Sequence, residues 1–258
     1  MTLIKSRLPT TGIDAIKSVE IDCVNATISG YFILTLSKLR RSVKHLICFL
    51  LTFLNFTLLG AQQNTSKILS QSQTKAIFTD SIKKELKINY PIFRVYKYAD
   101  KSGEFLCVLT ESNDSIDNNK DTFNHSIKAI NLKVDKRKLI KVWELNDNII
   151  KNGKDENSIW FWTSYFDFKD FDNDGLVEPI IVYGTRAMND YDDGRIKFII
   201  FYKGQKIAIR HQNGVLDDER KTQIDNSFYS LPKKLKDDIK AKMTLMEKQK
   251  KAIFTATW

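Results

Sequence analysis

One short acidic segment has the residue types and the spacing of a calcium-binding loop. In Asp170–Glu178, which reads DFDNDGLVE, carboxylates occupy positions 1, 3, 5 and 9 and glycine occupies position 6. Calcium takes six to eight oxygen ligands at about 2.3–2.6 Å, and a glycine permits the sharp turn that directs alternate side chains to one centre. The sequence therefore predicts a structural Ca²⁺ site. Its predicted ligands are Asp170, Asp172, Asp174, Glu178 and the backbone carbonyl of Leu176.

This segment is not a complete EF-hand. Position 12 is Ile181, where an EF-hand has a bidentate glutamate, and the flanking segments have the composition of strands. The loop instead resembles the calcium loops of integrin-type FG-GAP and related β-propeller repeats, which lie between strands and end on an acidic ligand at position 9. The resemblance covers about a dozen residues, so it implies the ion site and not a propeller. The alternative is an acidic turn without an ion.

A second acidic cluster follows, with Asp190, Asp192 and Asp193 before Gly194. It completes the first site, forms a weaker second site, or is a solvated hairpin loop, and such a cluster alone favours the loop.

Two tryptophans precede the calcium-type loop. Trp160 and Trp162 share one face of a predicted strand, because side chains alternate along a strand. On an exposed face they would stack against sugar rings. We favour burial in the core, which is the usual place of large aromatic rings.

The inventory for catalysis is small. The chain has no G-x-S-x-G, H-E-x-x-H or P-loop motif. His125 and His211 lie in no recognisable metal or nucleophile motif, and we expect His211 to be a surface or hydrogen-bonded residue. Carboxylate pairs for glycoside hydrolysis stay open, since such partners need not be close in sequence.

The segments that must position these residues are mostly strands. They alternate at period two, contain many aromatic and β-branched residues, and are separated by turns such as Asp100–Gly103 and Asp135–Lys138. The predicted strands are Ile92–Tyr98, Phe105–Thr110, Ser126–Val134, Leu139–Leu145, Ile159–Phe168, Pro179–Tyr183, Ile196–Tyr202 and Lys206–Arg210. We expect a mainly β fold, an antiparallel sheet, sandwich or barrel-like arrangement. The acidic, asparagine-rich segment 111–121 is predicted to be an exposed loop.

Two helices are expected at the ends of this β region. Asp80 or Ser81 caps a short helix through Ile88. At the C-terminal end, Pro232 begins an amphipathic helix. Its apolar positions, which repeat at helical spacing, are Leu235, Ile239, Met243 and Met246. Lysines cover the opposite face, and we expect the apolar face to pack on the sheet.

The N-terminal quarter has the pattern of an export signal. A basic cluster from Lys38 precedes the uncharged run LICFLLTFLNFTLL, which ends at the small residues Gly60-Ala61. We assign 39–61 as a signal peptide, 1–38 as an extension upstream of the true start, 62–79 as a flexible lead-in and 80–258 as a single domain. The apolar run is shorter than the roughly 20 residues of a membrane-spanning helix, so we expect no stable span after cleavage.

Charge and cysteine content limit the partners. The whole chain carries a formal net charge of +10. Residues 1–61 contain seven Lys or Arg and three Asp or Glu, which leaves +6 for the remainder. This modest excess is no argument for nucleic-acid binding, and we expect none. After residue 61, Cys107 is the only cysteine and lies in an apolar run, so no disulfide framework is predicted.

Several phrases together carry a family resemblance. These are NSIWFWT, DFDNDGLVEPIIVYGT, YDDGRIKFIIFYKGQKIAIRHQNG and FYSLP. They resemble a family of small exported bacterial proteins described as surface polysaccharide biosynthesis proteins, from about Tyr90 to the C-terminus. The resemblance implies a periplasmic or outer-surface location and partners among surface glycans or cell-envelope components. The expected function is that of an accessory or binding protein. A glycan-active enzyme using carboxylates and an adhesion or protein-interaction module are the alternatives.

Overall fold

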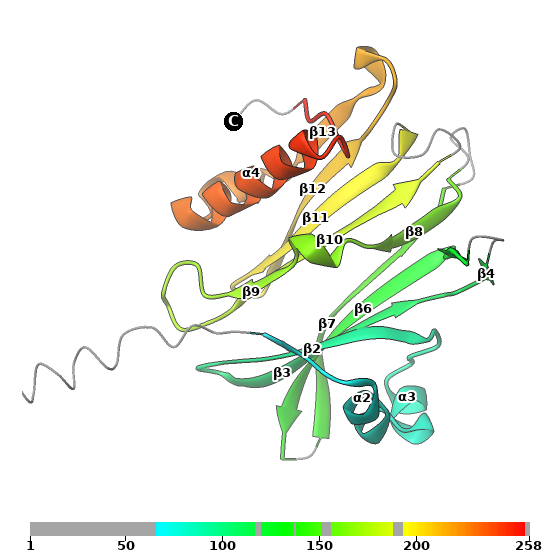
Figure 1. Ribbon diagram of the computed structural model, residues 1–258. Helices are drawn as coiled ribbons and strands as arrows, with labels where there is room; N and C mark the ends of the chain where they lie inside the picture. Colours follow the sequence, from blue (N-terminus) through cyan, green and yellow to red (C-terminus); the bar gives the residue numbers. More distant parts are fainter. Residues whose placement is uncertain (1–65, 117–119, 137, 151–155, 188–192, 256–258) are drawn as a thin grey trace, which may run out of the picture. The chain divides into compact units, whose positions relative to one another are not determined.

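The computed structural model describes residues 66–116, 120–136, 138–150, 156–187 and 193–255. All of them belong to one compact unit, Gln63–Trp258. The predicted signal peptide and the extension before it lie outside the described residues. The fold is mainly antiparallel β-sheet with short N-terminal helices and a C-terminal helix, which confirms the predicted class (Figure 1).

The first sheet has the strand order β1-β2-β3-β6-β7, with every neighbouring pair antiparallel. Its strands are β1 (Lys67–Ile68), β2 (Ile92–Asp100), β3 (Gly103–Glu111), β6 (Ser126–Asp135) and β7 (Lys138–Asn148). Both predicted hairpins are present, because Asp100 pairs with Gly103 and Asp135 pairs with Lys138.

The second sheet has the order β13-β12-β11-β10-β8, and β9 also pairs with β10. Its strands are β8 (Ser158–Phe161), β9 (Asp167–Lys169), β10 (Glu178–Arg186), β11 (Arg195–Tyr202), β12 (Gln205–Gln212) and β13 (Lys221–Ile224). In the described part of the chain they are accompanied by the 3₁₀ helices η1 (Thr163–Tyr165), η3 (Asp217–Glu219) and η4 (Asn226–Ser230).

The two sheets pack face to face around a shared core. One core cluster joins Tyr96, Phe105 and Leu109 of the first sheet to Ile181 and Ile199 of the second. Alternation along each strand sends the intervening residues to the outer faces. In the central strands β3 and β10 these outer residues are also buried, so both strands are nearly continuous buried runs and not alternating ones. The arrangement is a β-sandwich, one of the architectures that the sequence predicted.

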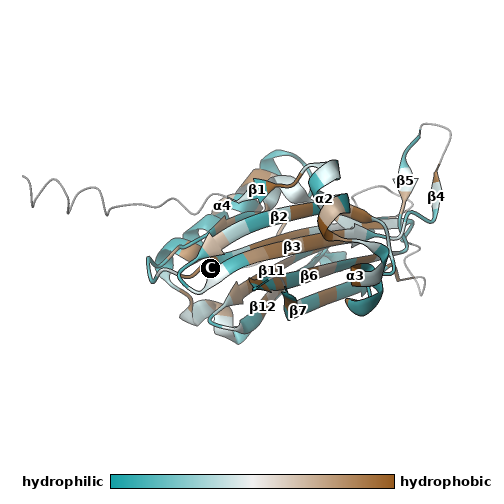
Figure 2. Cartoon of the chain, turned by 90° about the horizontal axis from the view of Figure 1, so that it is seen from below, coloured by the Kyte–Doolittle hydropathy of each residue, from teal (hydrophilic) through white to brown (hydrophobic). Residues whose placement is uncertain are grey.

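Helices cover both outer faces of the sandwich. On the first sheet, α2 (Gln71–Ile77) and α3 (Asp80–Glu85) pack over Leu106, Val108 and Ile130. Figure 2 shows apolar stretches in brown along β3 beside these helices. On the second sheet lies α4 (Lys233–Lys248). Its buried side chains are the four predicted ones, Leu235, Ile239, Met243 and Met246.

The segment expected to be a flexible lead-in contains β1 and α2 instead. Ser70 and Gln73 form a capping box, in which the Ser70 hydroxyl accepts from the Gln73 backbone N–H and the Gln73 side chain accepts from Ser70. This local pair starts α2 within a polar sequence. The cap of α3 is Thr79, one residue before the predicted position, and α3 ends at Glu85 and not at Ile88.

Two strand assignments also differ from expectation. The run Ile159–Phe168 is not one strand, because η1 interrupts it between β8 and β9. The aromatic residues there predicted a strand, but they are buried in different layers. Tyr165 packs under α4, and Phe168 packs between the two sheets. The predicted exposed loop 111–121 includes β4 (Ser115–Ile116), which pairs with β5 (Thr122–Phe123) in a small separate hairpin.

Candidate metal centre

The acidic loop joins two paired strands of the second sheet. Lys169 at the end of β9 pairs with Glu178 at the start of β10, so Asp170 and Glu178 stand beside each other at the base of a hairpin. Each of the four acidic residues, Asp170, Asp172, Asp174 and Glu178, offers one carboxylate oxygen, and these oxygens lie within 4.8 Å of one another. The described residues therefore include a cluster of four carboxylates that could hold a metal ion.

The loop backbone is shaped by its own side chains. The Asp170 carboxylate accepts from the backbone N–H groups of Asp174 at 3.1 Å and Gly175 at 2.7 Å. Asn173 and Gly175 have φ of 60° and 85°, in the left-handed region that asparagine and glycine tolerate. A Cβ at residue 175 would also lie 2.8 Å from Cδ of Lys101. Glycine at position 6 thus permits both the positive φ and the close approach of the Lys101 side chain.

Glu178 is the buried member of the cluster, with 2% of its surface exposed. Burial raises its pKa to about 7, and the negative charges of Asp172, Asp170 and Asp174 act in the same direction. A hydrogen bond from the Phe171 backbone N–H, at 2.7 Å, opposes this rise. A bound cation would offset the repulsion among these close carboxylates, since a cation favours the ionised form of Glu178.

A lysine at the tip of the β11–β12 hairpin faces the cluster. Lys203 Nζ lies 3.6 Å from Oδ2 of both Asp172 and Asp174. The neighbouring Tyr202 hydroxyl donates to Asp172 Oδ2 at 3.0 Å. The contact with Tyr202 and the nearby aspartates raise the pKa of Lys203. Its side chain is about half exposed, so this ammonium can leave the cluster without unfolding the hairpin.

The loop also contacts the opposite sheet at the β2–β3 turn. The Lys101 backbone N–H donates to the Gly175 carbonyl at 2.9 Å, and the Val177 N–H donates to Asp100 Oδ2 at 3.2 Å. The Lys101 ammonium donates to the Asp174 carbonyl. The sequence predicted residues 100–103 only as a hairpin turn. No local signal links it to a loop more than seventy positions later.

Other predicted site residues lie apart from this cluster. Asp190 and Asp192 fall outside the described residues, and the Asp193 carbonyl accepts from Gln212 Nε2 at 2.7 Å. His211 is not at the surface but is buried and hydrogen-bonded, the second of the two expected environments, with ring nitrogens 2.9 Å from Thr222 Oγ1 and 2.7 Å from Asn213 Oδ1. Burial lowers its pKa to about 4.

Trp162 and the cysteine are both accounted for by packing. Trp162 is 5% exposed and lies in the core between the second sheet and α4. Trp160 is only partly buried at the edge of that core, with its ring centroid 6.2 Å from that of Trp162. Cys107 is fully buried, and burial raises the pKa of its thiol, so the thiolate is disfavoured.

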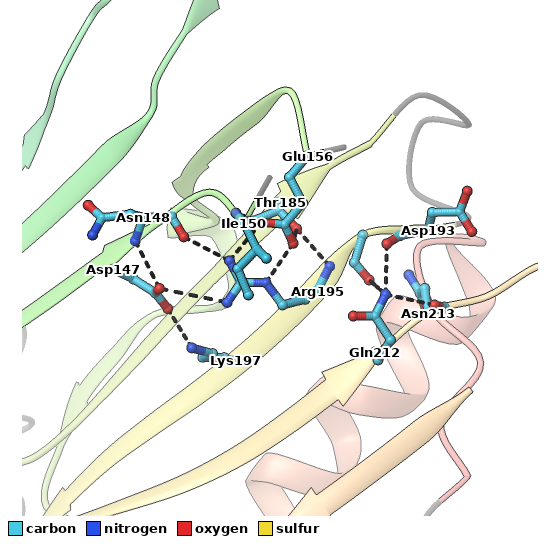
Figure 3. Close-up of polar contacts among 11 residues, drawn as sticks. Asp147, Asn148, Ile150, Glu156, Thr185, Asp193, Arg195, Lys197, Gln212 and Asn213 are labelled. Carbon is cyan, nitrogen blue, oxygen red and sulfur yellow. Dashed lines mark hydrogen bonds and ion pairs between the residues drawn. The ribbon is translucent and has the colours of Figure 1, made fainter. Parts of the chain in front are cut away.

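Sequence reasoning missed a charged network between the sheets (Figure 3). Arg195 on β11 makes a bidentate pair with buried Glu156, at 2.5 Å and 2.8 Å. Its Nη1 lies 3.7 Å from Asp147 of β7, which Lys197 contacts at 2.6 Å. Burial alone would raise the pKa of Asp147, but Lys197 and then Arg195 hold it below its ordinary value. These residues are separated by long stretches of sequence, and the available signal is the presence of Arg195 and Lys197 at the start of the otherwise apolar strand β11.

Fold and site together define the class, a two-sheet β-sandwich with helices on both outer faces and a candidate metal-binding hairpin loop. No protein-family model, curated protein or solved structure matches the chain. Within the described ranges, none of the helices has the length and apolar character needed to cross a membrane.

Proposed function

We propose that the Asp170–Glu178 loop binds Ca²⁺ as a structural ion. The observation that carries the proposal is the set of four carboxylate oxygens within 4.8 Å of one another, one of them from buried Glu178. Ligands at 2.3–2.6 Å from a common centre are at most about 5.2 Å apart, so this spread fits a calcium shell. An all-oxygen ligand set also suits a hard cation better than zinc or copper, which favour nitrogen and sulfur.

The ion would strengthen the connection between the two sheets. The loop belongs to the second sheet, while Asp100 and Lys101 contact it from the first. A cation that fixes Asp170 to Glu178 also fixes the backbone groups of Gly175 and Val177 that make these contacts. In this proposal the Leu176 carbonyl supplies a further oxygen, and Lys203 moves away when the ion enters.

Terbium luminescence tests the binding. Terbium replaces calcium in oxygen-ligand sites and emits when a nearby aromatic ring is excited, and Tyr202 is hydrogen-bonded to Asp172. We expect emission from the full-length chain that calcium quenches with a dissociation constant of about 10⁻⁴ to 10⁻³ M, the range of extracellular calcium modules. Asp172→Asn should abolish it. Asp217→Asn is the matched control, because Asp217 is almost fully exposed outside the loop. Equal emission from both variants would reject the site.

On the wider role, we propose an exported accessory protein of cell-surface polysaccharide assembly. Support comes from the basic and apolar pattern before Ala61 and from the resemblance of the phrases between Trp160 and Pro232. A C-terminal alkaline phosphatase fusion to the full chain tests export, because this reporter folds to an active form only after translocation. We expect activity that Leu51→Arg, a charge within the apolar run, removes. A fusion without activity would reject export.

A further inference from the structure

A cleft opens at the other end of the sandwich from the metal loop. It has a volume of about 490 Å³, within the 300–1,000 Å³ range of small-molecule sites. Its walls come from β2, the ends of β3 and β10, the β4–β5 hairpin and β8. The loop adjoins the first residue of β10 and the cleft adjoins the last. Nine residues of strand separate them, which is roughly 26 Å at about 3.3 Å per residue.

Aromatic rings line this cleft from both sheets. Phe93 on β2 is 46% exposed, which is unusual for a phenylalanine on a strand of the first sheet. Trp160 on β8 and Phe123 on β5 are partly buried and contribute further ring surface. Exposed aromatic surface gathered in a concavity marks a binding site more often than scattered apolar residues do.

A fixed set of polar groups lies between these rings. Glu111, at the end of β3, is buried, and its two carboxylate oxygens accept from the Phe161 backbone N–H at 3.1 Å and from Asn124 Nδ2 at 3.3 Å. Asn124 in turn accepts from the Asn113 N–H at 2.9 Å and donates its own N–H to Ser158 Oγ at 2.9 Å. A carboxylate offers about four acceptor positions, so Glu111 keeps capacity for donors of a ligand. These hydrogen bonds hold its carboxylate in place before a ligand arrives.

The charge of the cleft differs from that of the chain. The chain carries +10, but among the described residues that line the cleft the charged ones are Glu111, Asp121 and Arg186. This balance disfavours phosphates, nucleic acids and acidic polymers. A neutral sugar matches the lining, since its ring has an apolar C–H face for an aromatic ring and hydroxyl groups that donate to carboxylates and accept from amides and guanidinium.

We propose that this cleft binds a neutral saccharide, with a sugar ring on Trp160 and Phe93 and hydroxyl groups on Glu111. Neither the calcium site nor export is required, so this proposal stands or fails independently of them. Glu111 acts as a hydrogen-bond acceptor, and Arg186 and Asp121 supply the groups at the rim of the cleft.

The test uses the full-length chain on an array of neutral oligosaccharides of glucose, galactose, mannose and N-acetylglucosamine, followed by calorimetry with the sugars retained. We expect binding that Phe93→Ala and Trp160→Ala each weaken roughly fivefold to tenfold, the usual effect of truncating an aromatic contact worth about 1 kcal/mol or more. Tyr229→Ala is the matched control, because Tyr229 is 53% exposed and is not part of the cleft.

The variants separate loss of binding from loss of folding. Phe93 is half exposed, so Phe93→Ala should keep the wild-type melting temperature even if Trp160→Ala does not. Binding should also persist in chelator, which distinguishes this proposal from that of the calcium loop. Absence of neutral-sugar binding by the wild-type chain would overturn the proposal. Binding unaffected by both aromatic variants, or binding confined to sulfated or uronic-acid sugars, would also overturn it.

Discussion

The clearest test of the loop electrostatics is Glu178→Gln, which removes a buried charge but keeps an oxygen that can accept from the Phe171 N–H. In the folded chain without an ion the pKa of Glu178 is about 7, against an ordinary value of 4.5. Because the folded-state pKa is the higher one, ionisation costs stability as the pH rises from about 4.5 through 7. At pH 8 this difference corresponds to about 3 kcal/mol.

In chelator at pH 8 we therefore expect Glu178→Gln to be more stable than the wild type by up to about 3 kcal/mol. For a domain of this size that is roughly 6–12 °C in melting temperature. The gain should shrink toward zero below pH 4.5, where Glu178 is protonated in both states. Calcium at a hundred times its dissociation constant should add about 2.7 kcal/mol to the wild type. A variant with hundredfold weaker affinity would gain only about 0.4 kcal/mol.

The stability gained by removing the Glu178 charge and the stability gained by binding the ion should therefore not be additive. The assay is thermal unfolding followed by circular dichroism, in calcium and in chelator, at pH 5 and pH 8. Glu104→Gln is the matched control, because it removes an exposed carboxylate whose surface pair with Lys97 is worth about 0–1 kcal/mol. A Glu178→Gln chain less stable than the wild type in chelator would refute the reasoning, and so would an equal calcium gain in both chains.

Further predictions concern the interior of the sandwich. Arg195→Met should cost about 3–5 kcal/mol in urea unfolding, because it leaves buried Glu156 without its bidentate partner, and adding Glu156→Gln should recover part of the loss. His211 has a lowered pKa of about 4, so only the unfolded chain takes up a proton as the pH falls from about 6.5 to 4. Relative to His211→Gln, the wild type should lose on the order of 3 kcal/mol over that range, while His125→Gln should match the wild type. Met243→Ala should cost about 2–5 kcal/mol in the same assay, because Met243 is 2% exposed between α4 and the second sheet. An unchanged unfolding midpoint in Arg195→Met or Met243→Ala would contradict the packing described, and so would an equal pH dependence of the wild type and His211→Gln.

The features that the sequence predicted are those specified by neighbouring residues. The hairpin at Asp100–Gly103 and the apolar positions of α4 depend on turn chemistry and helical spacing, and both are confirmed. The acidic loop was recognisable for the same reason, since its carboxylates come from nine consecutive residues. The capping box of Ser70 and Gln73 was also a readable local signal, and a polar composition concealed it.

What sequence reasoning missed depends on pairs that are distant along the chain. Glu156, just before β8, meets Arg195 of β11 only because β10 pairs with both β8 and β11. Glu111 reaches Phe161 from the opposite sheet. The break at η1 was missed because Tyr165 and Phe168 have strand-like residue types, although different layers bury them. Residue type predicts well whether a side chain is buried, but it does not predict which sheet or helix buries it.

In the proposed calcium site, the Lys203 ammonium lies at carboxylates that a bound ion would contact, so the two cations would compete for them. These carboxylates belong to Asp172 and Asp174, and the ammonium is attached to the same chain. A dissolved competitor is removed by dilution, but a tethered one keeps a constant effective concentration. In the proposed calcium site an incoming ion would have to displace this ammonium, which would raise the calcium concentration at which half of the loops are occupied. Added salt screens the attraction between the half-exposed lysine and the carboxylates more than that of a buried ion. Moderate ionic strength therefore weakens the competition of Lys203 with the ion.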